Sequence, residues 1–578
     1  MALKVNSRKS TACGVNVHSK IRPQRRCNTL ASTPAVNMDH ENAMERVYGN
    51  GSFCIILTLC LASFSFILAY EYQSIVFLNF SPKFTCSDAR ITNASSVTWI
   101  SKSNYFKLTS SQKSTLPFSN DGDVEQCYAA VSDAAKNVRA LVCTNFTYDD
   151  SMMRLTIITD HDLVCDKRIW ANWLVAATMI AIAVGHSFAI FTDQFSRRRV
   201  LIFYMVMEIF WSLVTPFSSN LVGVFIFRIM RMLSIPLCYY ATGLLYELLP
   251  ARKRTLYGNL YWIPFCLGYM STAGLAYLTR DWKVFRLYGL LGLVGYIPLF
   301  FLLPESPRWL ILNGKYEEYK KTLATLARWN RVKLSENFLD EAVGVVRSID
   351  MATLKEPVGK PETLVDVFRS KNVRCIFLVF CAQLSAVSIG YYGLSTNADF
   401  ASDNVFLNVF YMGLSEAPSG FLGWLLCHLF SRRCSFIFAA AFVIPSLLVA
   451  PILRPFSSLA NTLIISIGKL MLTVEYNICL LHMTEFFPTT VRNMGLFFVM
   501  AFGCAISGLS TFINDLHVIY AYLPGIVYAA MNLIATLLTF LFLPNTKDCP
   551  LAQTISQAER LRRGKEGQWI ASLNSQNV

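Results

Sequence analysis

The segments ELLPARKR (247–254) and EFFPTTVR (485–492) are two copies of one charged sequence motif within a chain of 578 residues. Both read Glu-x-x-Pro-x-x-x-Arg, and each follows a long apolar run. The second copy begins 238 residues after the first, counted from 247 to 485. A short charged motif that recurs after an apolar run predicts that the chain contains an internal duplication.

The composition indicates the environment of this chain. Hydrophobic residues make up 54% and charged residues only 15% of the chain, and the mean hydropathy is +0.40. A soluble domain carries roughly a quarter charged residues. Here the apolar residues collect into runs long enough to cross the hydrocarbon layer of a bilayer. The composition therefore predicts a polytopic membrane protein.

Twelve such runs follow one another along the chain. They predict an all-α membrane protein with twelve transmembrane helices, and because this number is even, both termini are expected on the same side. The runs fall near residues 53–80, 169–191, 200–218, 221–246, 256–278, 284–303, 374–396, 403–429, 434–454, 459–483, 493–513 and 519–543.

Basic residues gather in alternate connections, and this bias sets the predicted orientation. The connections SRRR (196–199), ARKR (251–254) and SRR (431–433) lie on the same side as both termini, which the positive-inside rule places in the cytoplasm. The first fifty residues are polar and basic, without the apolar core of a cleaved signal, so the first run is expected to stay as an anchor. The net charge of +15 reflects this topology and implies no nucleic-acid partner.

Two more sequence motifs recur at nearly the same spacing as the first. DQFSRRR (193–199) returns as HLFSRRC (428–434), and LPESP (303–307) returns as LPNTK (543–547). Three markers in one order, each after the corresponding helix, predict two pseudo-symmetric six-helix halves, the arrangement of the major facilitator fold. The expected organisation is a cytoplasmic tail 1–52, a first half 53–303 with an extracellular loop 81–168, a cytoplasmic linker 304–373, a second half 374–543 and a cytoplasmic tail 544–578.

The long loop 81–168 between the first two helices has the features of an extracellular domain. It contains the cysteines Cys86, Cys127, Cys143 and Cys165, which on an oxidising face permit two disulfides in any of three pairings. It also contains glycosylation sequons at Asn93 and Asn145.

The repeated charges predict a conformational latch at the cytoplasmic helix ends. There, carboxylates and guanidinium groups from different helices can pair, each at about 0–1 kcal/mol, and together bias an equilibrium between two states. The alternative is ordinary solvation of helix ends. The predicted latch residues are Asp193, Arg197, Arg198, Glu247, Arg254, Glu305, Arg308, Arg432, Arg433, Glu485 and Arg492.

Several segments resemble the sequences of one known family. TIITDHDLVCD (156–166), RKRTLYGNL (252–260), LPESPRWLILNGK (303–315) and LPNTKDCPLAQTI (543–555) are similar to the organic cation/anion/zwitterion transporters, solute carrier family twenty-two of the major facilitator superfamily. The resemblance implies a plasma-membrane carrier of small amphiphilic organic ions, with a monomeric transport unit and no cofactor. It covers the chain from about residue 52 to residue 560.

This chain also departs from the family pattern. Ser196 stands where a Gly is usual, His428 where an Asp is usual, and Asn545 where a Glu is usual. The latch therefore has fewer charged residues than the resemblance to the family implies. Cys504 falls where cation carriers tend to place an Asp and anion carriers an Arg. Gly420 falls where some anion carriers hold a Lys. Both markers of substrate charge are therefore missing.

Ionisable groups inside the membrane are costly and are functional hypotheses by default. Glu475 is expected either to line the cavity or to pair with a base such as Arg228 or Arg231. Glu416 matches a family carboxylate, with a helix-to-helix hydrogen bond as the alternative. Lys469 is expected to pair with another helix or with a substrate and not with Glu475; the alternative is that it reaches toward the outer interface. Glu71 is at a position usually polar in the family, whereas Glu208 and His186 are expected to be packing groups.

Aromatic rings complete the expected cavity, since their faces can hold an organic cation. Tyr391, Tyr392 and Asn477 coincide with cavity positions of the family, whereas most other aromatic residues of membrane helices face lipid or neighbours. The candidate substrate-binding residues are Tyr391, Tyr392, Glu416, Glu475, Tyr476, Asn477, Trp262, Phe265 and Cys504.

The sequence therefore predicts a secondary-active or facilitative carrier of organic cations or zwitterions that works by alternating access. Two alternatives stay open: a non-transporting receptor or scaffold that uses the disulfide-linked outer loop, and an organic anion carrier. The sequence has no phosphate-binding loop, no convincing catalytic triad and no metal-ligand spacing among its seven histidines, so an enzyme is not expected.

Overall fold

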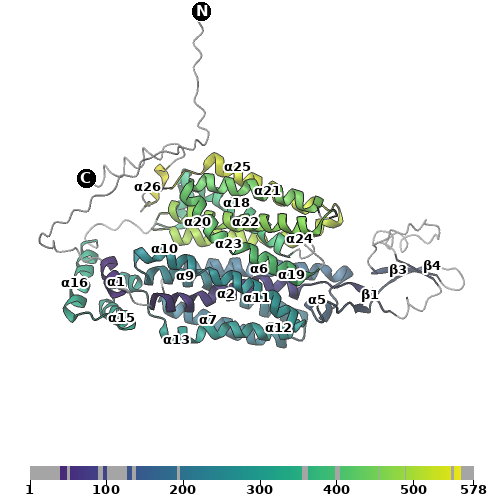
Figure 1. Ribbon diagram of the computed structural model, residues 1–578, viewed down its shortest axis with the longest axis horizontal. Coiled ribbons are helices and arrows are strands. Elements are labelled where there is room, and N and C mark those ends of the chain that lie inside the picture. Colours follow the sequence, from purple (N-terminus) through teal and green to yellow (C-terminus); the bar gives the residue numbers. More distant parts are fainter. Residues whose placement is uncertain are drawn as a thin grey trace, which may run out of the picture.

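A computed structural model of the chain shows two lobes of helices lying side by side, with a small sheet projecting beyond one end (Figure 1). The lower lobe in this view is built from α2 to α13 and the upper lobe from α18 to α25. The structure describes residues 40–48, 53–88, 91, 96–99, 126–132, 138–191, 195–353, 362–396, 404–453, 455–488, 490–547, 552 and 554–561.

The lower lobe, here called the N-half, consists of α-helices and short 3-10 helices. Its elements are α2 (Phe53–Leu78), α6 (Arg168–Phe191), α7 (Arg197–Val214), η3 (Thr215–Phe217), α8 (Leu221–Met232), α9 (Leu237–Leu248), α10 (Ala251–Leu260), α11 (Ile263–Thr279), α12 (Trp282–Gly289), η4 (Leu290–Tyr296) and α13 (Ile297–Leu302).

The upper lobe, here called the C-half, follows the same plan. Its elements are α18 (Lys371–Thr396), α19 (Val405–Glu416), α20 (Ser419–Leu429), α21 (Arg432–Leu453), α22 (Ser458–Phe486), α23 (Arg492–Ser507), α24 (Ser510–Asn514), η6 (Asp515–Val518) and α25 (Leu523–Phe542).

Within the described residues, nine helices are long and apolar enough to cross a membrane. The three other predicted spans are shorter or interrupted. The run 221–246 is split into α8 and α9, the run 403–429 into α19 and α20, and the run 256–278 is divided between α10 and α11. The major facilitator architecture is thus present, while the number of twelve stays a prediction.

Proline explains two of these interruptions, because its ring removes a backbone donor and clashes with the preceding helical turn. Pro236 immediately precedes α9 and Pro418 immediately precedes α20. The break at Pro418 leaves Glu416 as the last residue of α19. Irregular backbone inside a membrane is tolerated where protein encloses it, and it often marks a binding site.

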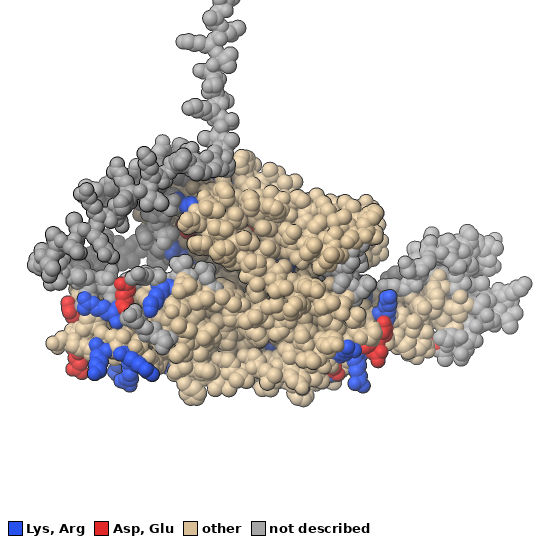
Figure 2. All heavy atoms as spheres, in the orientation of Figure 1, with Lys and Arg blue, Asp and Glu red and all other residues tan. Residues whose placement is uncertain are grey.

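Charged residues gather at the two ends of the bundle. On the face shown in Figure 2, blue and red atoms lie near α15 and α16 at one end and near α5 at the other, while the flank between them is tan. Large hydrophobic side chains such as Phe203, Phe301 and Phe421 are exposed on the helices. An apolar flank between two charged rims is the surface expected of a membrane-embedded bundle.

The most extensive contacts between the two halves join α6 with α23 and α11 with α19. Small residues permit these close approaches. A Cβ atom at Gly413 of α19 would lie about 3.0 Å from the Met270 side chain of α11, and one at Gly508 would lie 3.3 Å from the carbonyl oxygen of Ala176 in α6.

The connection between α2 and α6 carries two antiparallel sheets. One pairs β1 (Phe84–Cys86) with β5 (Phe146–Tyr148), and the other has the order β2 (Ser96–Trp99), β3 (Tyr128–Ser132), β4 (Val138–Val142). The short helices α5 (Ile157–Asp160) and η1 (Cys165–Lys167) then lead into α6.

The structure selects one of the three disulfide pairings that the sequence leaves open, Cys86 with Cys143 and Cys127 with Cys165. The first disulfide joins the ends of β1 and β4, and the second ties β3 to η1 at the root of α6. Asn145 is exposed in the turn before β5, as a glycosylation site requires, whereas Asn93 lies outside the described residues.

Helices also cover the opposite end of the bundle. Between the two halves lie α14 (Pro307–Leu312), α15 (Tyr316–Trp329), α16 (Glu336–Thr353) and α17 (Leu364–Arg369), and α26 (Ile555–Arg560) follows the last span. The sequence analysis did not anticipate α1 (His40–Tyr48), which packs against α15 and α16 within the predicted tail 1–52. Its buried Met44, Val47 and Tyr48 join the core of the N-half.

We expect peptide mapping under non-reducing conditions to recover the pairs Cys86–Cys143 and Cys127–Cys165. The double variant Cys86→Ser/Cys143→Ser should lose about 4 kcal/mol of stabilisation of the outer domain, because a disulfide spanning 57 residues restricts the unfolded chain strongly. Limited proteolysis of the purified protein should show earlier cleavage in this domain. Cys375→Ser, which removes a thiol that forms no disulfide, is the control. Recovery of a Cys86–Cys127 peptide would contradict the pairing.

Candidate functional site

Aromatic side chains from both halves meet between the lobes. Tyr392 of α18 lies 5.4 Å from Tyr72 of α2, measured between ring centroids, and 5.3 Å from its neighbour Tyr391. The hydroxyl groups of Tyr239 in α9 and Tyr476 in α22 are 2.8 Å apart and form a second contact between the halves. The Tyr239 ring also lies 5.7 Å from that of Trp262. Both halves therefore contribute rings to one interface, in which Tyr391, Tyr392, Trp262 and Tyr476 were predicted.

Two more predicted residues reach the same interface. Phe265 of α11 lies 6.2 Å from Trp262. Cys504 of α23 belongs to the C-half in sequence, yet it packs against the core of the N-half, as Tyr392 does. The position at which the family resemblance leads us to expect a charge is thus filled by a small, weakly polar thiol at the boundary between the halves.

Glu416 and Lys469 form a buried ion pair beside this interface. The Lys469 Nζ atom lies 3.5 Å from Glu416 Oε1, and the two side chains are 0% and 1% exposed. The Tyr391 hydroxyl donates to Glu416 Oε2 at 3.2 Å. The same hydroxyl accepts from the amide of Gln73 in α2 at 3.5 Å, which links this pair to the N-half.

The ammonium group of Lys469 has four further contacts. It lies 3.1 Å from the centroid of the Tyr391 ring and 5.7 Å from that of Tyr269, a residue of α11 in the N-half. It also donates to the Tyr391 carbonyl oxygen at 3.2 Å and to the Ser395 hydroxyl. We call this enclosure the ammonium box. The prediction that Lys469 pairs with another helix is confirmed by Glu416 of α19, and the alternative that it reaches the outer interface is wrong.

Glu475 lies elsewhere in the C-half. Its Oε2 atom accepts from the Asn532 amide of α25 at 2.8 Å, and its Oε1 atom is buried without a hydrogen bond. The predicted pairing with Arg228 or Arg231 is wrong, because both guanidinium groups contact Glu71. Asn477 lies two residues further along α22, and its Cβ atom would be 3.8 Å from a Cβ placed on Gly423 of α20.

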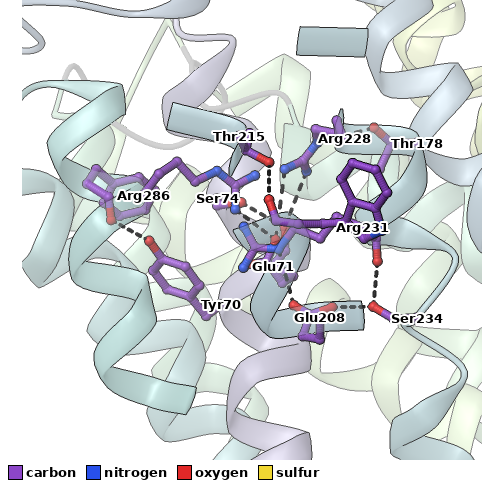
Figure 3. A network of polar contacts seen from close by, with 12 residues as sticks. Tyr70, Glu71, Ser74, Thr178, Glu208, Thr215, Arg228, Arg231, Ser234 and Arg286 are labelled. Atoms are coloured by element: carbon purple, nitrogen blue, oxygen red, sulfur yellow. Dashed lines mark hydrogen bonds and ion pairs between the residues drawn. The ribbon is translucent and has the colours of Figure 1, made fainter. Parts of the chain in front are cut away.

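The sequence analysis missed a buried network in the N-half, shown in Figure 3. Arg231 contacts Glu71 and also donates to Glu208 at 3.1 Å, and Arg286 donates to Glu71 Oε2 at 2.7 Å. Arg228 lies 4.0 Å from the same carboxylate. We call these five residues the N-half ionic cluster.

All five members are at most 3% exposed, and they come from α2, α7, α8 and α12. Thr178 of α6 accepts from Arg228 at 3.3 Å, which joins a fifth helix to the cluster. Breaking a pair in such a cluster leaves an uncompensated buried charge. A signal was present in the sequence, since both acids and all three bases stand inside apolar runs, but only the fold shows that they converge.

The predicted latch residues of the N-half meet at the end of the bundle opposite the sheets. Arg197, at the start of α7, lies 3.5 Å from Glu247 near the end of α9 and donates to the Tyr240 hydroxyl at 3.0 Å. Glu305 accepts from the Ser196 hydroxyl and from the Arg198 backbone amide at 3.2 Å. The Arg198 and Arg308 side chains are exposed.

The C-half repeats this contact. Arg432, at the start of α21, binds Glu485 near the end of α22 through two nitrogens, the shorter distance being 2.7 Å. Thr546 also donates to Glu485, in the segment that corresponds to Glu305 in the first half. Arg492 donates to the Phe487 carbonyl oxygen at 3.2 Å. This hydrogen bond joins two residues of the motif EFFPTTVR (485–492). Arg433 is half-buried beside Arg432.

Two predicted latch residues lie beyond this description. Asp193 is outside the described residues, and for Arg254 only the backbone of α10 is described. The ion pairs found for the other latch residues join different helices of one half. They hold α7 to α9 and α21 to α22. In the part of the chain that the structure describes, no group of three or more His, Cys, Asp or Glu residues is placed to hold a metal ion.

Two lobes that share this duplicated contact and an enclosed polar interface define a transporter of the major facilitator class. The family profile described as "Sugar (and other) transporter" matches residues 91–556, and the chain belongs to this family. Relatives named as members of solute carrier family 22 confirm the narrower resemblance. The chain is thus a membrane transporter and not an enzyme.

Individual relatives cover most of the chain. The human Organic cation/carnitine transporter 2 is 28% identical over 416 residues, which are 70% of this chain and 72% of that protein. The Beta-alanine transporter of Drosophila melanogaster is 28% identical over 418 residues, which are 71% and 68% of the two chains. The inward-open structure of the xylose transporter XylE from E. coli superposes with a TM-score of 0.57 at 15% identity, covering 90% of this chain and 99% of its own, and supports the fold alone.

We expect Glu71→Gln to destabilise the protein by about 3–5 kcal/mol, because three buried guanidinium groups would then share one carboxylate. Thermal unfolding of the purified protein and its amount at the cell surface would measure the effect. Glu318→Gln removes the same charge from an exposed pair with Lys315 and should change stability by less than about 1 kcal/mol. Equal melting temperatures for the two variants would show that the N-half ionic cluster is dispensable.

Proposed function

We propose that this protein carries small amphiphilic organic ions, cationic or zwitterionic, across the plasma membrane by alternating access. Both termini would lie in the cytoplasm and the disulfide-linked sheets outside the cell. The observation that carries this proposal is the placement of a buried carboxylate, a buried ammonium group and several tyrosine rings where the two halves meet.

The chemistry of these groups suits an organic ion. A carboxylate and the faces of tyrosine rings attract ammonium groups, most strongly where water is excluded. The relatives also support the proposal, since one is named for organic cations and carnitine and another for beta-alanine. The substrate itself would be a small organic ion bound between the halves.

Contacts near the sheet-bearing end support the alternating part of the proposal. There Asn172 of α6 donates to Asp515 of η6, and the Trp173 ring lies edge-on to Phe512 at 5.3 Å. Phe77 of α2 stacks on Phe406 of α19 at 5.5 Å. Each contact joins the N-half to the C-half, so the outer route would open only when the halves separate here.

The repeated ion pairs would act as braces within each half. Because Arg197–Glu247 and Arg432–Glu485 each tie two helices of the same half, the halves would rock as rigid bodies while the interface between them opens and closes. The latch predicted from the sequence is therefore proposed in a revised form, as a pair of braces that keep each moving half intact.

A receptor or scaffold with an ordered outer domain is the rival function. Uptake into cells of labelled organic cations, anions and zwitterions separates the two, with cells that lack the protein as the control. We expect saturable accumulation of cations or zwitterions that unlabelled substrate competes away. Binding to the outer domain without accumulation of any class would favour the scaffold, and accumulation of anions alone would favour the anion carrier.

Arg432→Ala tests the brace in the C-half and should lower the maximal uptake rate several-fold. The variant removes the two-nitrogen contact with Glu485, and the two side chains are only 16% and 19% exposed. Arg433→Ala removes the same charge from the adjacent residue and should leave the rate near that of the unaltered protein. Surface biotinylation would correct both rates for the amount of protein. Equal losses in the two variants would indicate a general effect of charge and not of the pair.

A further inference from the structure

The N-half ionic cluster contains one more positive than negative charge. Its arginines Arg228, Arg231 and Arg286 form ion pairs with only two carboxylates among the described residues, those of Glu71 and Glu208. All five side chains are at most 3% exposed. A buried charge without a counter-charge is strongly unfavourable, so the cluster needs one further negative charge.

The neighbouring hydroxyl groups do not supply this charge. The Tyr70 hydroxyl is buried and donates to the Phe285 carbonyl oxygen at 2.7 Å, so it keeps its proton. The Ser234 hydroxyl also keeps its proton, because it donates to Glu208. Protonation of either carboxylate would enlarge the positive excess. The missing charge must therefore come from a bound anion.

The donors that lack an acceptor are concentrated on Arg286. Its Nη1 atom donates to Glu71 Oε2 at 2.7 Å (Figure 3). Its Nε and Nη2 atoms are buried and have no hydrogen-bond partner among the described residues. These two nitrogens lie on one edge of the planar guanidinium group, so a complete two-donor edge is available. The Nη1 atoms of Arg228 and Arg231 are also buried without a hydrogen bond.

We propose that the Nε–Nη2 edge of Arg286 binds a small monovalent anion, of which chloride is the probe, and that this ion neutralises the N-half ionic cluster. Buried polar groups need a partner, and a two-donor edge of arginine suits an anion that accepts from both nitrogens. The Arg286 side chain is 0% exposed, so the ion must be small. Because Arg286 joins α12 to Glu71 of α2, the ion is a structural component of the N-half and not a substrate between the halves.

Thermal unfolding of the purified, unaltered protein at constant ionic strength tests this inference. Sodium chloride titrated into sodium gluconate should raise the melting temperature by about 3 °C and then saturate, because an ion that binds only the folded state stabilises it. Gluconate is a monovalent anion too large for an enclosed site. A melting temperature that does not distinguish chloride from gluconate would overturn the inference.

Sulfate separates charge balance from a general effect of salt. It stabilises folded proteins because it is excluded from their surface. Its two negative charges would, however, leave the cluster with a negative excess. We expect sulfate titrated in the same way to give no saturable rise, and a rise equal to that with chloride would contradict a site for a single negative charge.

Arg286→Gln removes both the excess charge and the two-donor edge. The cluster is then neutral by itself, so this variant should fold without chloride and lose the chloride-dependent rise in melting temperature. Arg199→Gln is the matched control, because it removes one positive charge from an exposed side chain of α7 and should keep the full rise. Equal responses to chloride in the two variants would overturn the assignment to Arg286.

Arg228→Gln gives a second test if Arg286→Gln fails to fold. It keeps the edge of Arg286 but removes the excess charge, and Arg228 makes the longest ion pair of the cluster, at 4.0 Å from Glu71. The chloride concentration that gives half of the rise should increase about tenfold or more. An unchanged concentration would show that charge balance does not hold the ion and would overturn the inference.

Discussion

A charge inside a bilayer must find an opposite charge within the protein, and this constraint organises both halves of the molecule. In the N-half, Arg228, Arg231 and Arg286 surround Glu71, and Glu208 holds Arg231 from a second side. Four helices are joined by these contacts, with their charges enclosed. The ion pairs of the cluster lie within the N-half and position α2 and α8, and therefore the Tyr72 side of the interface.

The C-half uses the same constraint differently. Lys469 of the Lys469–Glu416 pair faces the Tyr269 ring of the N-half, and the Tyr391 hydroxyl links Glu416 to Gln73, so the pair lies at the boundary between the two halves. In the proposed transport cycle, an ion pair at this boundary would meet the substrate when the halves separate. The difference between an ionic cluster locked inside one half and an ion pair shared between halves is the physical basis for assigning structure to the first and recognition to the second.

Much of this arrangement could be predicted from sequence because it depends on local or repeated patterns. Apolar runs indicated the spans, and the repeated motifs indicated the duplication. In the structure, Arg197–Glu247 and Arg432–Glu485 are equivalent contacts in the two halves. The site was predicted in part: the rings of Tyr391 and Tyr392 and the carboxylate of Glu416 were named, Lys469 was named without its partner, and Tyr72 was not named. Glu475 was assigned the wrong partner, since the face of a long helix that meets a given neighbour depends on packing that spacing alone does not specify.

The sequence by itself determined the membrane class, the two-fold repeat, the family and the cysteines available to the outer loop, because hydropathy and repeated motifs are properties of the linear chain. Only the tertiary structure decided which cysteines pair, where α8 and α9 separate, which arginines share Glu71, and that Lys469 turns inward to Glu416. Those outcomes depend on which helix faces meet in three dimensions. For a buried charge, the partner that ends up within reach decides the role of the residue.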